Sequence, residues 1–236
     1  MSAHAKRSAG LIALDLDGTL EDSRDDMVAA VLRVREAFGL PPRPGEGFRA
    51  HVNGGMAHLY RVCFEELLAD PPTHARACEA YVADYAAHIA EATRLYPEMA
   101  DALAELSELG PLAIVTNKPE GLSERLLTAL GVRERFAVVI GGDSCPEAKP
   151  SPVPLRIAAQ RVGLSSIGDS GDPPVLMIGD SAGDVRCGKA AGAAVIWCAW
   201  GYAPGLSFGP GEPSPDHTAA TPRELPELVR AVLASS

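Results

Sequence analysis

Two aspartates one residue apart follow an apolar run near the start of the chain, in LIALDLDGTL at residues 11–20. At the end of an extended segment, Asp15 and Asp17 would point to the same side, because side chains alternate along a strand. Like charges that close repel each other unless a cation lies between them. Mg²⁺ prefers oxygen ligands and keeps water molecules that a phosphate can displace. The pair therefore predicts a metal-assisted reaction of a phosphate group.

Further polar residues follow three later apolar runs, in VTNK, EAKPSP and GDSAGD. The Thr116 hydroxyl can donate to a phosphate oxygen, and Lys149 supplies a compact positive charge where charge develops in a transition state. Asp180 could complete the metal site. Gly18 allows a tight turn after the aspartate pair, so that backbone amides there could face an anion. Together these residues favour phosphoryl transfer more strongly than any one of them alone.

These residues need a sheet edge to bring them together. Short apolar runs predict five buried parallel strands, and helical stretches alternate with them, which is typical of an α/β fold. Ligands bind such open sheets at the carboxyl ends of the strands, where the polar residues stand. The predicted strands are 11–14, 112–115, 136–140, 175–178 and 194–198, and the predicted helices are 98–109, 119–130, 152–162, 182–191 and about 223–233.

One segment breaks the alternation of strands and helices. Residues 22–96 show helical periodicity and polar loops but no convincing strand, which predicts an all-helical insert after the first strand. We expect a core of residues 1–21 and 97–236, with the insert acting either as a lid on two hinges or as an insertion without a role of its own. The Gly- and Pro-rich stretch 205–222 predicts a surface loop.

Composition excludes several classes of function. A net charge of −10 and a pI near 5.1 argue against binding to nucleic acid or to an anionic membrane. The five cysteines are odd in number and lack CxxC spacing, which indicates reduced thiols rather than disulfides or a zinc site. The N-terminus has no apolar leader, so we expect a soluble, cytoplasmic protein. Oligomeric state cannot be predicted.

The motifs resemble those of the haloacid dehalogenase superfamily: DLDGT at 15–19, VTN with Thr116, Lys149, and GDSAGD with Asp180 and Asp184. The resemblance implies a Rossmann-like sheet of order 5-4-1-2-3, with Asp15 as nucleophile and Asp17 as general acid and base. It also implies Mg²⁺ held by Asp15, the backbone carbonyl of Asp17 and Asp180. Asp184 would orient a metal-bound water or Lys149.

Within the superfamily, the chain is most similar to phosphoglycolate phosphatases with a small helical cap. True dehalogenases lack the second aspartate, and phosphonoacetaldehyde hydrolases use a cap lysine that residues 22–96 do not contain. The TNK triplet is similar to that of phosphoglycolate phosphatases and suggests that Asn117 binds substrate. In the cap, HVNGGMAHLYRV resembles their substrate loop, with Gly55 and Arg61 as ligands and Asn53 in place of the first glycine.

The resulting prediction is a magnesium-dependent phosphatase of a small phosphate monoester, with 2-phosphoglycolate as the best candidate, acting through an aspartyl-phosphate. A sugar-phosphate mutase and a non-catalytic phosphate-binding protein are the alternatives. Lys118, Lys189 and the pair His51 and His58 are interpreted as exposed side chains of helices. The predicted substrate ligands are Gly18, Asn117, Gly55 and Arg61, beside the catalytic residues Asp15, Asp17, Thr116 and Lys149 and the metal ligands Asp15, Asp17, Asp180 and Asp184.

Overall fold

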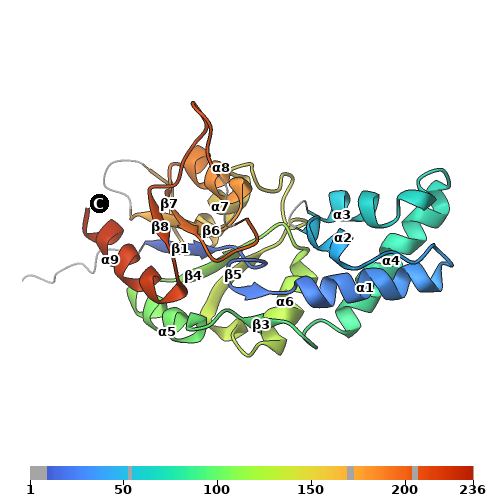
Figure 1. Ribbon diagram of the computed structural model, residues 1–236. Coiled ribbons are helices and arrows are strands. Elements are labelled where there is room, and N and C mark those ends of the chain that lie inside the picture. The colour runs from blue at the N-terminus through green and yellow to red at the C-terminus, as the bar shows by residue number, and fades with distance from the viewer. Residues whose placement is uncertain (1–9, 53–54, 169–172, 204–206, 236) are drawn as a thin grey trace, which may run out of the picture.

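A six-stranded parallel sheet forms the centre of the protein in the computed structural model, which describes residues 10–52, 55–168, 173–203 and 207–235 (Figure 1). Its order is β5-β4-β1-β6-β7-β8, so the five core strands follow the predicted 5-4-1-2-3 order, with a sixth strand beside the fifth. The strands are β1 (Leu11–Leu14), β4 (Leu112–Val115), β5 (Phe136–Ile140), β6 (Val175–Gly179), β7 (Ala194–Cys198) and β8 (His217–Ala219).

The middle strand, β1, is buried on both faces because its apolar side chains serve two cores. Ile12 and Leu14 belong to the cluster on one side of the sheet, whereas Leu11 and Ala13 belong to the cluster on the other. β1 pairs in parallel with both β4 and β6. This central position explains why the sequence of β1 is continuously hydrophobic up to Asp15.

Helices cover both faces of the sheet and bury its apolar side chains. One layer holds α5 (Met99–Leu109), α6 (Glu120–Ala129) and α9 (Leu225–Ser235), and the other holds α7 (Val153–Arg161) and α8 (Ala182–Ala191). These five helices confirm the predicted ones to within three residues at each end. Two 3₁₀ turns, at Arg133–Arg135 and Pro222–Glu224, precede β5 and α9.

The segment between β1 and β4 forms a helical module beside the sheet (Figure 1). It contains α1 (Arg24–Ala37), α2 (Glu46–Arg49), α3 (Met56–Cys63), a 3₁₀ turn (Glu65–Leu67) and α4 (Pro71–Ala87). The two long helices pack together and are linked by an ion pair of 2.6 Å between Arg33 and Asp84. The buried Asp26 carboxylate in α1 accepts hydrogen bonds from both backbone amides of Ala92 and Thr93, which fixes the returning chain.

Three short strands were not predicted. β2 (Glu21–Asp22) and β3 (Arg94–Leu95) form an antiparallel pair where the chain enters and leaves the helical module, so the predicted absence of strands near 22–96 was wrong at both edges. β8 lies inside the stretch 205–222 that was predicted to be a loop, and it pairs with β7. Strands of two or three residues leave no readable alternation in the sequence.

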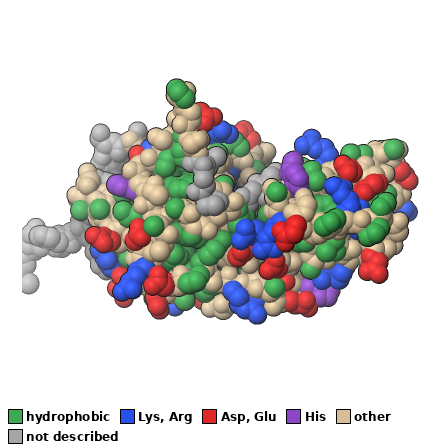
Figure 2. All heavy atoms as spheres, viewed as in Figure 1, with side chains coloured by type: hydrophobic (Ala, Val, Ile, Leu, Met, Phe, Trp, Pro, Cys, Tyr) green, Lys and Arg blue, Asp and Glu red, His purple; other side chains and the backbone are tan. Residues whose placement is uncertain are grey.

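The surface drawn in Figure 2 shows acidic and basic side chains scattered over the visible face, so the net charge of −10 is not gathered there in one patch. No helix within the described ranges is long and apolar enough to span a membrane. All five cysteines are free thiols, and Cys63, Cys187 and Cys198 are buried.

Candidate active site

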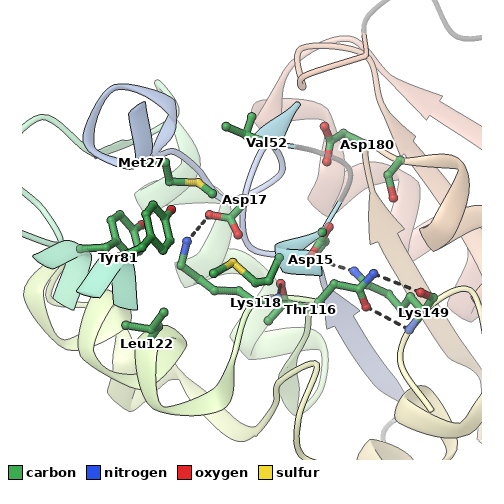
Figure 3. Close-up of a pocket in the computed structure, with 15 residues that line it drawn as sticks. Asp15, Asp17, Met27, Val52, Tyr81, Thr116, Lys118, Leu122, Lys149 and Asp180 are labelled. Carbon is green, nitrogen blue, oxygen red and sulfur yellow. Dashed lines mark hydrogen bonds and ion pairs between the residues drawn. The ribbon is translucent and has the colours of Figure 1, made fainter. Parts of the chain in front are cut away.

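A cavity opens at the carboxyl ends of β1, β4 and β6, between the sheet and the helical module (Figure 3). About 610 Å³ of space, including open solvent at its mouth, lies between the lining residues. Its polar end is lined by Asp15, Thr116, Asn117, Lys149, Asp180 and Ser181. Its other end contains Asp17 and Lys118 among the apolar and aromatic residues Met27, Val52, Met56, Tyr81, Tyr85 and Leu122.

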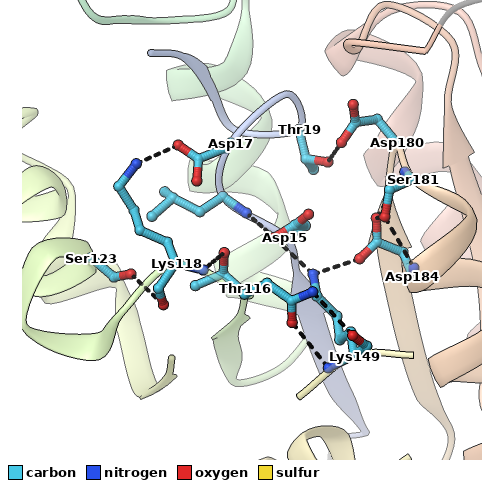
Figure 4. Close-up of polar contacts among 12 residues, drawn as sticks. Asp15, Asp17, Thr19, Thr116, Lys118, Ser123, Lys149, Asp180, Ser181 and Asp184 are labelled. Atoms are coloured by element: carbon cyan, nitrogen blue, oxygen red, sulfur yellow. Dashed lines mark hydrogen bonds and ion pairs between the residues drawn. The ribbon is translucent and has the colours of Figure 1, made fainter. Parts of the chain in front are cut away.

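Lys149 lies beneath this polar end, 6% exposed, and is held from two sides (Figure 4). Its Nζ lies 2.8 Å from Asp15 Oδ1 and 2.6 Å from Asp184 Oδ1. The Asn117 side chain donates to the Lys149 carbonyl and accepts from the Lys149 amide, both at 3.0 Å. Burial alone would lower the pKa of Lys149, but the two carboxylates outweigh it and raise the pKa, so the ammonium stays charged.

Asp15 is the carboxylate at the centre of the site. Its backbone amide donates to Ile178 of β6, which fixes it in register with the neighbouring strand, and Leu16 donates to its Oδ1 at 2.7 Å. Burial and the charge of Asp184 raise the pKa of Asp15 to about 7, and the nearby Lys149 only partly opposes them. A buried carboxylate with this much unfavourable charge around it is a natural partner for a cation.

The residues present fit a magnesium ion. Oxygens of Asp15, Asp180 and Asp184 all lie within 4.8 Å of one another. Burial and the charges of the other two aspartates raise the pKa of Asp180 to about 7. Gly18 and Gly201 make room for the Asp180 carboxylate, because a Cβ at either position would overlap it. Hard oxygen donors in this number suit Mg²⁺.

Within this cluster, Asp184 is the least free to bind metal directly. Its Oδ1 accepts from Lys149, and its Oδ2 accepts from the amide and hydroxyl of Ser181, at 2.9 and 2.7 Å. The Asp184 amide in turn donates to Ser181 Oγ, and this bond and that from the Ser181 amide form a capping box that starts α8. The geometry therefore favours the expected role of Asp184 in orienting Lys149, while direct ligation by Asp184 stays a prediction.

We expect Mg²⁺ to stabilise the protein more at pH 8 than at pH 6. The raised pKa values of Asp15 and Asp180 mean that the folded protein holds protons that the unfolded chain has released between pH 3.8 and about 7. These two groups therefore make the metal-free protein less stable as the pH rises through that window. Mg²⁺ offsets the loss once the protons have left.

Thermal unfolding with and without Mg²⁺ measures this effect. At 100 times Kd, a gain of about 2.7 kcal/mol corresponds to a rise of roughly 5–10 °C in Tm for a chain of this size. The variant Asp180→Asn serves as the control and should lose most of the rise. Equal Tm shifts at pH 6 and pH 8, or none at pH 8, would contradict this prediction.

Asp17 lies on the opposite side of the site from Asp180. Its Oδ1 accepts from Ser23 Oγ and from Lys118 Nζ, each at 2.6 Å. Burial would raise the pKa of Asp17, but the charge of Lys118 and the hydrogen bonds outweigh it and hold the pKa below its usual value. Burial and the charge of Asp17 raise the pKa of the adjacent Glu21 well above its ordinary value, which disfavours its charged form.

The interpretation of Lys118 as an exposed helix residue was wrong. Its side chain is 2% exposed and lies in the cavity, with Nζ 4.7 Å from the centre of the Tyr85 ring. Lys189, by contrast, is partly exposed and pairs with Asp216 on the surface. Two sequence signals could have singled out Lys118: its place in the TNK triplet, and the scarcity of lysine, which makes up only four of the 21 basic residues.

Sequence reasoning also missed a set of hydrogen bonds that joins the start of the helical module to the site. Tyr202 accepts from the Ser23 amide at 2.9 Å, and its own amide donates to Asp180 Oδ2 at 2.7 Å. Thr19 Oγ1 donates to Asp180 Oδ1 at 3.1 Å. The entrance to the helical module is thus tied to Asp180.

The remaining predicted ligands occupy different places. Gly55 lines the cavity, and its φ of 77° lies in the region that favours glycine. Arg61 is exposed on α3, with its guanidinium 3.4 Å from His58 Nδ1, and it does not line the cavity. The Gly18 amide donates to the Glu21 carbonyl. The substrate roles of Gly18, Gly55 and Arg61 stay predictions, and Asn53 lies outside the described residues.

His51 and His58 form a partly buried pair, with ring nitrogens 3.0 Å apart, rather than two fully exposed side chains.

Thr116 is buried, and its hydroxyl accepts from the Lys118 amide at 3.2 Å. A hydroxyl that accepts from the backbone keeps its own proton free to donate. This orientation suits the expected contact of Thr116 with an anion.

Comparison with known proteins decides which family this site belongs to. The sequence matches the haloacid dehalogenase-like hydrolases over residues 12–198, from the first strand to the fifth core strand. The chain belongs to this family. A phosphoglycolate phosphatase of Chromobacterium violaceum is 40% identical over 202 residues, covering 84% of this chain and 88% of that protein. A phosphoglycolate phosphatase of Neisseria gonorrhoeae is 40% identical over 195 residues, covering 81% and 80%.

Solved structures agree with this assignment to the haloacid dehalogenase-like hydrolases. The crystal structure of a predicted phosphoglycolate phosphatase from Haemophilus somnus superimposes with a TM-score of 0.80 at 25% identity, covering 93% of this chain and 97% of that one. The family match and the phosphatase relatives make this protein a phosphatase. The predicted fold and family are confirmed.

Proposed function

We propose that this phosphatase is magnesium-dependent and hydrolyses a small carboxylated phosphate monoester, with 2-phosphoglycolate as the best candidate. The observation that carries the proposal is the position of Asp15, between Lys149 on one side and the carboxylate of Asp180 on the other. The names of the relatives support the choice of substrate.

In the proposed reaction, Asp15 attacks the phosphorus atom, and the leaving alkoxide departs as an aspartyl-phosphate forms. Asp17 gives a proton to the leaving oxygen and later takes one from the water that hydrolyses the intermediate. Lys149 and the Thr116 hydroxyl stabilise the charge on the phosphoryl oxygens. Phosphate is released and Asp15 returns to its starting form.

Asp15, the Asp17 carbonyl and Asp180 would hold the metal. When bound, Mg²⁺ neutralises part of the charge on the aspartates and on the phosphate. Asn117 and Asp184 keep Lys149 beside Asp15 through the contacts described above. Thr19 and Tyr202 hold the Asp180 carboxylate in place.

We further propose that residues 22–96 act as a cap on a core of residues 1–21 and 97–236. The antiparallel pair β2 and β3 spans both crossings between these parts and is a suitable hinge. Closure of the module would exclude water from the phosphoryl group. A cytoplasmic location also stays a prediction.

Phosphate release from a panel of small esters tests the proposed function. We expect turnover with Mg²⁺, none with excess EDTA, and the highest kcat/KM for 2-phosphoglycolate. A preference for another ester would keep the reaction and change the substrate. No turnover of any ester would contradict the proposal, and turnover only of a sugar phosphate in the presence of a bisphosphate activator would indicate the mutase instead.

A further inference from the structure

Lys118 supplies positive charge at the end of the cavity away from Lys149. Among the described residues that line the cavity, Lys118 and Lys149 are the cationic ones. Figure 3 shows their amines pointing to different aspartates, Lys149 to Asp15 and Lys118 to Asp17. The two charges therefore serve different parts of the same cavity.

The backbone of Lys118 starts at the proposed phosphate end. Its amide donates to Thr116 Oγ1 (Figure 4). Its side chain extends to the aromatic wall formed by Tyr81 and Tyr85 of α4, where Nζ lies 4.7 Å from the Tyr85 ring centre. One side chain thus spans from the phosphoryl site to the helical module. A group attached within a few atoms of the phosphate lies within its reach.

The aromatic wall contains two hydroxyls without a partner among the described residues, those of Tyr81 and Tyr85. Tyr81 is completely buried, and within the described part of the chain its hydroxyl has no hydrogen-bond partner, although it lines the cavity. A buried polar group left unpaired is costly, so such a hydroxyl indicates a missing acceptor. Figure 3 shows Tyr81 on the same side of the cavity as the Lys118 amine and Asp17.

The expected cationic ligand from the module does not fill this role in the structure. Arg61 is exposed and lies outside the cavity lining. An ammonium group has three donors, and Lys118 Nζ donates one of them to Asp17. The pair of Lys118 and Tyr81 can therefore donate to an added acceptor while the Asp17 contact is kept.

We propose that Lys118, together with the Tyr81 hydroxyl, recognises a second anionic group on the substrate, attached within a few atoms of the phosphoryl group. This inference rests on the proposed phosphatase function and assigns the residues that select a carboxylated ester over a neutral one. Both residues determine specificity by direct contact. The site therefore prefers phosphate monoesters that carry a carboxylate in addition to the phosphate group.

The test compares 2-phosphoglycolate with 2-phosphoglycolamide, in which a neutral amide of similar size replaces the carboxylate. For the wild type we expect kcat/KM to favour the carboxylate by about 100-fold, since charged hydrogen bonds are the strong ones. Lys118→Met should reduce this ratio by about 10- to 100-fold. Tyr81→Phe removes only one hydroxyl and should reduce the ratio by roughly tenfold, mainly through KM for the carboxylate.

Two matched variants serve as controls. Lys189→Met removes a surface lysine, and Tyr60→Phe removes a hydroxyl from a neighbouring tyrosine that packs edge-on against Tyr81 but does not line the cavity. Both should leave the ratio unchanged. If Lys118→Met does not fold, Tyr81→Phe decides the matter, because Phe has nearly the same shape as Tyr and the hydroxyl it removes is unpartnered.

Each outcome separates the inference from the function on which it rests. Hydrolysis of both esters by the wild type with equal kcat/KM would keep the phosphatase and overturn the inference. The inference would also be overturned if Lys118→Met lowered kcat/KM equally for both esters and Tyr81→Phe left the ratio of the two kcat/KM values unchanged. Lys118 would then serve only to hold Asp17. Failure of the wild type on both esters would reject the proposed function, and the inference with it.

Discussion

Asp15→Asn is expected to abolish phosphate release from every ester, lowering kcat by roughly 10⁴- to 10⁶-fold, as removal of a catalytic nucleophile does. An amide of nearly the same shape keeps the packing at the end of β1 but is a poor nucleophile toward phosphorus. Steady-state phosphate release, with a detection limit set by a blank without enzyme, measures the loss. The size of the loss in kcat distinguishes a nucleophile from a residue that only helps to bind the substrate.

The matched control is Asp143→Asn, another aspartate at the carboxyl end of a core strand. Asp143 is exposed and accepts from the Glu120 amide at 2.7 Å, which an asparagine oxygen can also do. This variant should keep wild-type turnover. If Asp15→Asn kept more than about a tenth of the wild-type kcat while folded, Asp15 would not be the nucleophile.

Asp17→Asn is expected to lower kcat by about 10²- to 10⁴-fold for alkyl phosphates, which is the usual contribution of a general acid or base. The loss should be smaller for p-nitrophenyl phosphate, because nitrophenolate leaves without needing a proton. Hydrolysis of the intermediate should still be slow, since the base for water is missing. A rapid burst of nitrophenolate, equal to the enzyme concentration and followed by slow turnover, is therefore the expected time course.

Stopped-flow absorbance with this variant and the wild type checks the prediction. The variant Asp101→Asn is a suitable control, because Asp101 is an exposed acid in the first turn of α5 and does not line the cavity. It should behave like the wild type. Equal losses for the alkyl and nitrophenyl esters, without a burst, would contradict a proton-transfer role for Asp17.

The sequence was sufficient to predict the sheet because its core strands are continuous apolar runs. β1 and β6 are buried on both faces, and their hydrophobic stretches end at Asp15 and Asp180. Since the carboxyl ends of parallel strands lie at the same edge of a sheet, the positions of the two aspartates followed from the order of the strands. Burial on both faces made the predicted bounds accurate to one residue.

Lys118 could not be placed from sequence because its environment comes from two distant segments. Asp17 follows β1, and Tyr85 belongs to α4, so both are far from Lys118 along the chain. A lysine at a helix start is ordinarily solvated, and only docking of the helical module buries it. The exposed position of Arg61 could not be predicted for the same reason, since a local motif does not determine which face of α3 lines the cavity.

The short strands show the limit of periodicity. β2 and β3 contain two residues each, and their pairing depends on the two ends of the module meeting. β8 follows a Gly- and Pro-rich stretch and is positioned by β7. In each case tertiary contact decides the structure, and local sequence preference contributes little.

The central claim is that the phosphoryl group passes through Asp15, and chemical trapping of the intermediate tests it most directly. Borohydride reduces an aspartyl-phosphate to homoserine and leaves free aspartate unchanged. Protein quenched during turnover with Mg²⁺ and 2-phosphoglycolate, then reduced, digested and mapped by mass spectrometry, should contain homoserine at position 15. Homoserine should be absent without substrate. Unmodified Asp15 during active turnover, or homoserine at another aspartate, would contradict the account.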